Sequence, residues 1–140
     1  MNQSRPLSKR AFIVGGHITK FIGAKHPDFI WKRHPDYGKI DNPGIEDYIA
    51  EAVNGCFNNT NVAAAAIDKM WIGNFAGELF SNQGHLGAAL VGAHPDLYNK
   101  PSMRVEGACA SGGLAFACAL DSIQAGSSDV TLVAGAEVQT

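Results

Sequence analysis

The stretch RVEGACASGGLAFACAL, residues 104–120, joins a short strand-like run to a run of small residues that has the spacing of a helix. Cys109 lies where the two runs meet, among glycine, alanine and serine neighbours that carry little side-chain bulk. A second apolar run, VTLVAGA, begins at Val130 and supplies a further strand. A strand, a helix and a strand in this order form a parallel crossover unit, so the stretch predicts an α/β fold.

The same alternation extends upstream of residue 104. AFIVGG, IDKMWIGNF and SMRVEGA are apolar runs that favour strands, so we expect a mostly parallel sheet covered by helices, with strands at residues 11–16, about 69–74, 103–108 and 130–136. Helical spacing predicts a helix from Pro43, with Asn42 as its cap, and a second helix capped by Ser81. The apolar stripe of the first helix comprises Ile45, Tyr48, Ile49, Ala52, Val53 and Cys56. That of the second comprises Leu86, Ala89, Leu90 and Ala93. A third helix is expected over residues 110–125 and is ended by Gly126.

Composition and charge exclude several classes of protein. The 140 residues are 46% hydrophobic and 17% charged, which excludes a disordered or fibrous chain, and the formal net charge of -2 gives no electrostatic case for nucleic-acid binding. No apolar run approaches the roughly 18 residues of a membrane span, so we expect a soluble intracellular protein without one. Residues 1–10 are expected to be a flexible solvated tail, with a transit peptide as the alternative, and residues 26–39 are expected to be a polar surface insertion.

The other two cysteines have a simpler interpretation than Cys109. Cys56 completes an apolar helical stripe and is expected to be a core thiol. Cys118 lies nine residues after Cys109, on the opposite face of the helix and ~13 Å along its axis, so it is expected in the core with Leu114. The chain has no C-x-x-C pair and no metal-ligand spacing, and we predict neither a metal site nor a cofactor.

The position of Cys109 indicates a nucleophile. The free N–H groups and positive dipole end of a following helix stabilise a thiolate, and the same N–H groups could hold the oxyanion formed when that thiolate attacks a carbonyl. Gly112 and Gly113 disfavour a helix, so they indicate close approach, either by a ligand or by another packed helix. None of the five histidines supplies an obvious base.

At these residues the chain resembles the thiolases, in particular their sterol-carrier-protein branch. VEGACASGG, residues 105–113, resembles the nucleophile segment V-N-x-x-C-[SAG]-S-G, with Cys109 at the nucleophile position and Glu106 where many members have asparagine. VAGAEVQT matches Gly135 and Glu137 of the family's G-G-x-E, with Ala134 in place of the first glycine. AFIVGGHITKF resembles the opening strand, and IGNFAGELFSNQGHLGAAL resembles the segment near the subunit contact.

The resemblance implies that residues 11–140 form most of a thiolase N-terminal domain, incomplete at its C-terminal end. It also implies an acyl-CoA thiolase or acetyl-CoA acetyltransferase of lipid metabolism, which acts through an acyl-cysteine on Cys109 and works as a homodimer or tetramer. Coenzyme A thioesters would be its substrates. The remaining acid and base residues of the family come from a second domain that these 140 residues lack, so we expect the fragment alone to be inactive.

Two other functions stay open from the sequence. One is another condensing enzyme of the superfamily, either decarboxylating or of the hydroxymethylglutaryl type. The other is a catalytically silent thiolase-like module that serves assembly or lipid-related binding. The cytosol, the mitochondrion and the peroxisome are equally compatible with the sequence.

Overall fold

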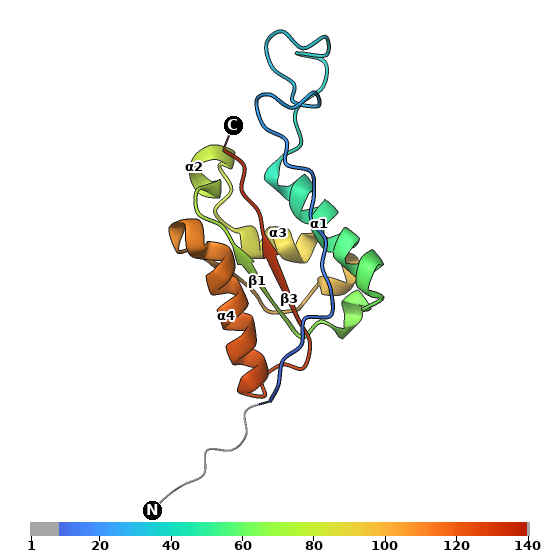
Figure 1. The fold of residues 1–140 in the computed structure, drawn as a ribbon, viewed down its shortest axis with the longest axis vertical. Helices are drawn as coiled ribbons and strands as arrows, with labels where there is room; N and C mark the ends of the chain where they lie inside the picture. Colours follow the sequence, from blue (N-terminus) through green and yellow to red (C-terminus); the bar gives the residue numbers. More distant parts are fainter. Residues whose placement is uncertain (1–8, 140) are drawn as a thin grey trace, which may run out of the picture.

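The structure, a computed structural model, describes residues 9–139 and is built on a three-stranded parallel sheet (Figure 1). Its elements in chain order are α1 (Ile45–Thr60), η1 (Ala64–Ala66), β1 (Lys69–Gly73), α2 (Gly77–Ser81), α3 (Leu86–Gly92), η2 (Pro95–Leu97), β2 (Ser102–Val105), η3 (Ala108–Ala110), α4 (Ser111–Gln124) and β3 (Thr131–Gly135). The strand order is β2-β1-β3, and both pairs are parallel. The predicted α/β class, and the strands expected near residues 69–74, 103–108 and 130–136, are therefore confirmed.

The strand register places the carboxyl ends of all three strands in one row. Gly73, the last residue of β1, pairs with Val105 of β2 and with Gly135 of β3. Side chains alternate between the faces of β1: Met70 and Ile72 pack with the core of α1 and α3, and Trp71 packs with α4. Figure 1 shows α4 on one side of the sheet and α1 and α3 on the other. Loops that follow the strands thus meet at one edge.

Helix α1 confirms the apolar stripe but not the predicted cap. Ile45, Ile49 and Val53 are buried, as the spacing requires. The helix begins after Gly44, whose N–H donates to the Asp47 carboxylate at 2.8 Å. The prediction of Asn42 as the cap is wrong, because its amide side chain is bonded to the backbone of residue 30 instead.

The strand predicted at residues 11–16 is absent. Within the part of the chain that the structure describes, no backbone hydrogen bond joins this segment to the sheet, and Ile13 is 77% exposed. The segment instead passes α1, where the Asn59 amide donates to the carbonyl of Gly16 at 3.2 Å. An apolar run indicates an extended segment but does not supply the neighbouring strand that a ladder needs, and here β3 pairs with β1 alone.

The segment after Ser81 is helical, but Ser81 does not cap it. Ser81 is the last residue of α2, and its hydroxyl donates to the Gly77 carbonyl at 2.6 Å. A short turn follows, and α3 then buries Leu86 and Leu90 as predicted. The helix predicted over 110–125 is α4, at residues 111–124. Leu114, expected in the core, is 42% exposed and contradicts that prediction.

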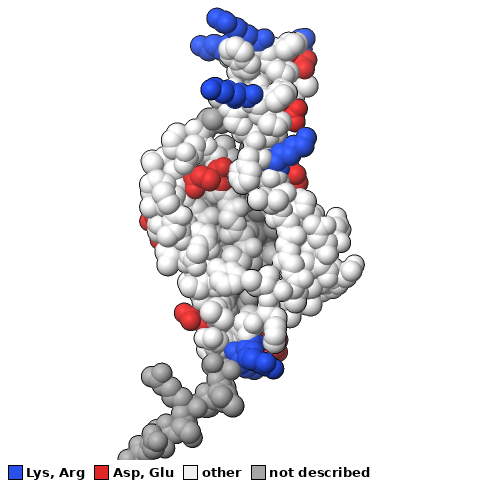
Figure 2. Space-filling view, viewed as in Figure 1, with Lys and Arg blue, Asp and Glu red and all other residues white. Residues whose placement is uncertain are grey.

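Residues 17–44 contain neither a helix nor a strand, and successive turns between residues 23 and 40 carry the chain away from the sheet (Figure 1). Lysine and arginine side chains gather on the visible face of this segment (Figure 2). Most of the predicted tail, residues 1–8, lies outside the described residues, and Lys9 pairs with Asp129 at 2.7 Å. No helix between residues 9 and 139 is long and apolar enough to cross a membrane.

Candidate functional site

Cys109 lies in the turn η3, directly before α4, and is exposed. The residue before it, Ala108, has a φ of 50°, a left-handed conformation that is uncommon for a residue with a side chain. The buried Ser111 closes the turn: its hydroxyl accepts the Gly107 N–H at 2.9 Å and donates to the Ala108 carbonyl at 2.7 Å. A strained turn held by a buried side chain fixes the direction in which the thiol points.

Glu106 helps to hold the same turn. One oxygen of its carboxylate accepts the Ala108 N–H at 2.6 Å. This bond to the backbone two residues on helps to hold the turn, so Glu106 performs a structural task beside the candidate nucleophile.

The start of α4 is open on the side of Gly112 and Gly113. A Cβ atom added to either glycine would meet no atom within 4 Å. Residues 9–139 therefore place no other helix against them, which removes the packing explanation within this part of the chain. The space beside Cys109 is accessible from solvent.

Gly73 is the glycine that close packing requires here. A Cβ atom on Gly73 would lie 2.5 Å from the backbone of Ser111 and 2.6 Å from the nitrogen of Gly112. The end of β1 thus touches the start of α4. Nothing in the sequence singled out Gly73, because this contact joins residues that lie far apart along the chain.

Glu137 connects the ends of β1 and β3. Its carboxylate accepts the N–H groups of Phe75 and Ala76, both at 2.9 Å, and lies 3.3 Å from the amide nitrogen of Asn74. Asn74 is fully buried and donates to the Ala136 carbonyl at 2.8 Å. The resemblance singles out Glu137 without giving it a task, and no motif pointed to Asn74. Together they fix the loop that follows β1.

Arg104 of β2 holds that loop from the other side. Its guanidinium donates to the carbonyl of Phe75 at 2.9 Å and to that of Gly84 at 3.5 Å, and it lies 3.9 Å from the Glu78 carboxylate. The loop between β1 and α2 is therefore bonded to both neighbouring strands. Its aromatic side chain, Phe75, stays exposed at the edge of the sheet.

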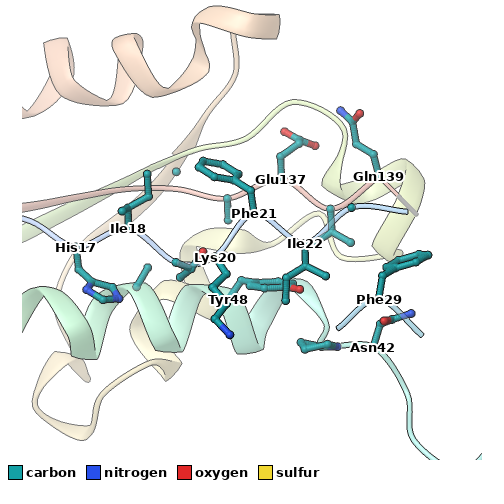
Figure 3. A pocket seen from close by; sticks show the side chains of 17 residues that line it. His17, Ile18, Lys20, Phe21, Ile22, Phe29, Asn42, Tyr48, Glu137 and Gln139 are labelled. Atoms are coloured by element: carbon teal, nitrogen blue, oxygen red, sulfur yellow. The ribbon is translucent and has the colours of Figure 1, made fainter. Parts of the chain in front are cut away.

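A cavity of about 650 Å³ opens at the carboxyl end of β3 (Figure 3). Its walls are residues 17–23, the region around the start of α1, and residues 135–139. Figure 3 shows Ile22 on the segment that precedes α1 and Tyr48 on α1 itself. This volume lies within the usual range of small-molecule sites.

Comparison with known proteins places this arrangement in a family. Residues 35–140 match the family of the thiolase N-terminal domain. The chain belongs to the thiolases. An acetyl-CoA acetyltransferase of Methanothermobacter thermautotrophicus is 36% identical over 104 residues, which are 74% of this chain and 27% of that protein. One of Methanocaldococcus jannaschii is 38% identical over 104 residues, 74% of this chain and 26% of that protein. The chain spans about a quarter of the length of these curated relatives.

The other two cysteines of this thiolase chain lie away from the turn. Cys56 packs against the core that α1 and α3 share, as predicted, and burial raises the pKa of its thiol. Cys118 is half-buried against the cluster around Trp71, on the face of α4 that meets the sheet. Cys109 is thus the exposed thiol of the three, and all three are free.

The histidines of the described chain make local contacts. Three of them belong to His-Pro-Asp segments in which Nδ1 accepts the N–H of the aspartate at 3.1 or 3.2 Å, and these are His26, His34 and His94. His17 contacts Asn59, and His85 precedes α3. Between residues 9 and 139 no hydrogen bond joins a histidine to Cys109, and no three His, Cys, Asp or Glu side chains form a metal-binding group.

Proposed function

We propose that this chain is the acyl-accepting part of a thiolase-type acyltransferase and that Cys109 is its nucleophile. The observation that carries the proposal is the exposed thiol in a strained, internally bonded turn before α4, within a chain of the thiolase family. The relatives at 36% and 38% identity are named acetyl-CoA acetyltransferases, which favours coenzyme A thioesters as the substrates.

The proposed reaction is acyl transfer to the thiolate of Cys109. The Cys109 thiolate attacks the carbonyl carbon of an acyl-CoA, the bond from that carbon to the sulfur of coenzyme A breaks, and coenzyme A leaves as a thiolate that takes up a proton. The acyl group is then a thioester on Cys109, ready for transfer to a second nucleophile. The N-terminal end of α4, which begins two residues after Cys109, would supply N–H groups to the oxyanion.

Labelling of thiols tests the proposal. Iodoacetamide or acetyl-CoA is expected to modify Cys109 first in the full-length protein, because Cys56 and Cys118 are partly buried. Cys109→Ala is expected to abolish acyl transfer and leave the circular dichroism spectrum unchanged, with Cys118→Ala as the matched control. Peptide mass spectrometry identifies the modified residue, and preferential modification of Cys118 would show that the nucleophile is misplaced.

The 140-residue chain alone is expected to be labelled without turnover, since no proton donor or acceptor contacts Cys109 in the described residues. Sustained cleavage of acetoacetyl-CoA by this chain would contradict that expectation. A full-length protein that is never acylated on Cys109 would favour the silent thiolase-like module. Acylation without transfer to acetyl-CoA would favour another condensing enzyme of the superfamily.

We further propose that the protein assembles as a homodimer or tetramer through β2. This strand is at the edge of the sheet in residues 9–139, and Met103 on it is 43% exposed. An edge strand presents unpaired backbone groups and is usually protected in the native protein, and the exposed apolar side chain of Met103 supports a second copy beside it.

A further inference from the structure

Residues 25–40 contain the same short segment twice in succession. The sequence reads KHPDFIWK from residue 25 and RHPDYGKI from residue 33, so each copy has a cation, the triplet His-Pro-Asp and an aromatic residue in the same order. The same hydrogen bonds hold both copies. The N–H groups of His26 and His34 donate to the carbonyls three residues earlier at 2.8 and 2.7 Å, and those of Phe29 and Tyr37 donate to the two histidine carbonyls at 3.0 Å. Bonds of this kind form each turn locally, so matching side chains occupy equivalent places in the two copies.

Three cations of this double turn, which we define as residues 23–40, have no bonding partner within the protein. Lys25, Lys32 and Arg33 are exposed, and none of them forms a hydrogen bond or an ion pair with residues 9–139. Arg33 lies over the ring of Trp31, 5.7 Å from its centroid, and this tryptophan is itself 47% exposed. Figure 2 shows lysine and arginine side chains gathered at the projecting end of the molecule. The double turn therefore presents free positive charge beside an aromatic ring.

Elsewhere in the described chain, positive charge is largely used inside the protein. The cations that bond to a carboxylate, a hydroxyl or a backbone carbonyl are Lys9, Lys20, Lys39, Lys69, Lys100 and Arg104. Arg10 differs from these, because it lies over the ring of Phe12 at 5.6 Å. In a chain whose formal net charge is -2, the free cations are thus concentrated on one projecting element.

The double turn fits the carboxylates of a protein segment better than the phosphates of a nucleic acid or a bilayer. Asp28 and Asp36 lie between its cations in the sequence, so it presents separate positive charges and no continuous basic surface. Tight nucleic-acid binding draws on about 6–10 phosphate contacts, and binding to a bilayer surface commonly uses an amphipathic helix. The double turn has three free cations and no helix. Charge-assisted bonds to carboxylates and stacking on an exposed ring suit these groups.

We propose that the double turn binds an acidic, extended segment of another protein. Lys25, Lys32 and Arg33 contact the carboxylates of that segment, and Trp31 contacts its apolar side chains. Because the two copies place Lys25 and Arg33 at equivalent positions, they suit a segment whose carboxylates recur along its length. This binding surface is separate from acyl transfer and does not depend on the role of Cys109.

Reversal of single charges tests the proposal in the full-length protein. The probe is a fluorescein-labelled peptide of glutamate, leucine and glycine, and its binding is followed by fluorescence anisotropy. Arg33→Glu and Lys25→Glu are each expected to weaken binding at least about tenfold, because each removes an attraction and adds a repulsion. Neither side chain is bonded within residues 9–139, so the melting temperature is expected to stay unchanged. The same peptide with glutamine in place of glutamate is expected not to bind.

Arg10→Glu is the matched control. It makes the same charge change on a cation that also lies over an exposed aromatic ring, but outside the double turn, and is expected to change binding less than about twofold. Trp31 reports the contact directly, because Trp71, the other tryptophan of the chain, is buried. The peptide is expected to shield Trp31 from quenching by acrylamide, and Trp31→Phe is expected to abolish that change.

Equal weakening by Arg10→Glu, or retained binding of the glutamine peptide, would overturn the proposal. Tighter binding of coenzyme A, of phosphatidylserine vesicles or of a short duplex DNA than of the acidic peptide would also overturn it, because each would identify a phosphate site. Shielding of Trp31 before the peptide is added would show that the rest of the full-length chain covers the double turn, with the same consequence. In Arg33→Glu, loss of peptide binding together with wild-type acylation of Cys109 would support a surface separate from the candidate nucleophile.

Discussion

Asp68 shows how one exposed carboxylate organises the entry to a strand. It accepts the backbone N–H groups of Val130 at 2.9 Å and Asp129 at 2.8 Å, directly before β3. These two bonds, with a smaller contribution from Lys100, hold the pKa of Asp68 below its ordinary value of 3.8, against a weak opposing effect of burial. The ionised form is thus favoured by folding.

The pKa shift of Asp68 predicts a pH dependence. Because the folded-state pKa is below the unfolded one, the stabilisation is complete above about pH 4 and is lost as the pH falls through the lower, folded-state pKa. Asp68→Asn is expected to lower the melting temperature by a few degrees at pH 7, and the difference from wild type should shrink at pH 3. Thermal unfolding followed by circular dichroism measures the melting temperatures at both pH values. A difference between variant and wild type that grows on acidification would contradict a lowered pKa of Asp68.

At the scale of elements, replacing two glycines near Cys109 by alanine is expected to change the stability of the protein in opposite directions. In Gly73→Ala the new methyl group would meet the backbone of Ser111. The free energy of unfolding should therefore fall by about 1–3 kcal/mol, and the turn that holds Cys109 should be disturbed. In Gly113→Ala the methyl group would point into open space from a position within α4. The free energy of unfolding should therefore rise by up to about 1 kcal/mol.

Urea unfolding measures the stability of both glycine variants, and the rate of Cys109 alkylation measures the state of the turn. A stable Gly113→Ala variant that is no longer acylated would identify Gly113 as a point where the substrate approaches, which is the ligand interpretation that the sequence allowed. A Gly73→Ala variant as stable as wild type would contradict the contact between β1 and α4.

The elements also show which parts of the fold a sequence can predict. The stripe of α1 and the place of Cys109 between a strand and a helix depend on residues that are close together in the chain, and the structure confirms both, whereas the role of Cys109 stays a prediction. Residues 11–16 are as apolar as a strand, but pairing depends on a neighbour elsewhere in the chain, and the prediction was wrong. Glu137 and Asn74 meet across 63 residues, so only the sheet topology brings them together.

For the whole molecule, the edge strand β2 predicts assembly. A second copy beside β2 would cover the exposed side chain of Met103 and pair the outer hydrogen-bonding groups of the strand. The full-length protein is therefore expected to run as a dimer or tetramer in size-exclusion chromatography with light scattering. Met103→Lys places a charge on that edge and is expected to weaken the assembly at least about tenfold, because an unpaired charge would be buried between the copies.

Ile40→Lys is the matched control. It changes an apolar side chain that is also exposed, but that lies far from β2 in the sequence and outside the sheet, and it should leave the assembly intact. A wild-type protein that is monomeric over a wide concentration range, or equal effects of the two lysine variants, would refute the role of β2.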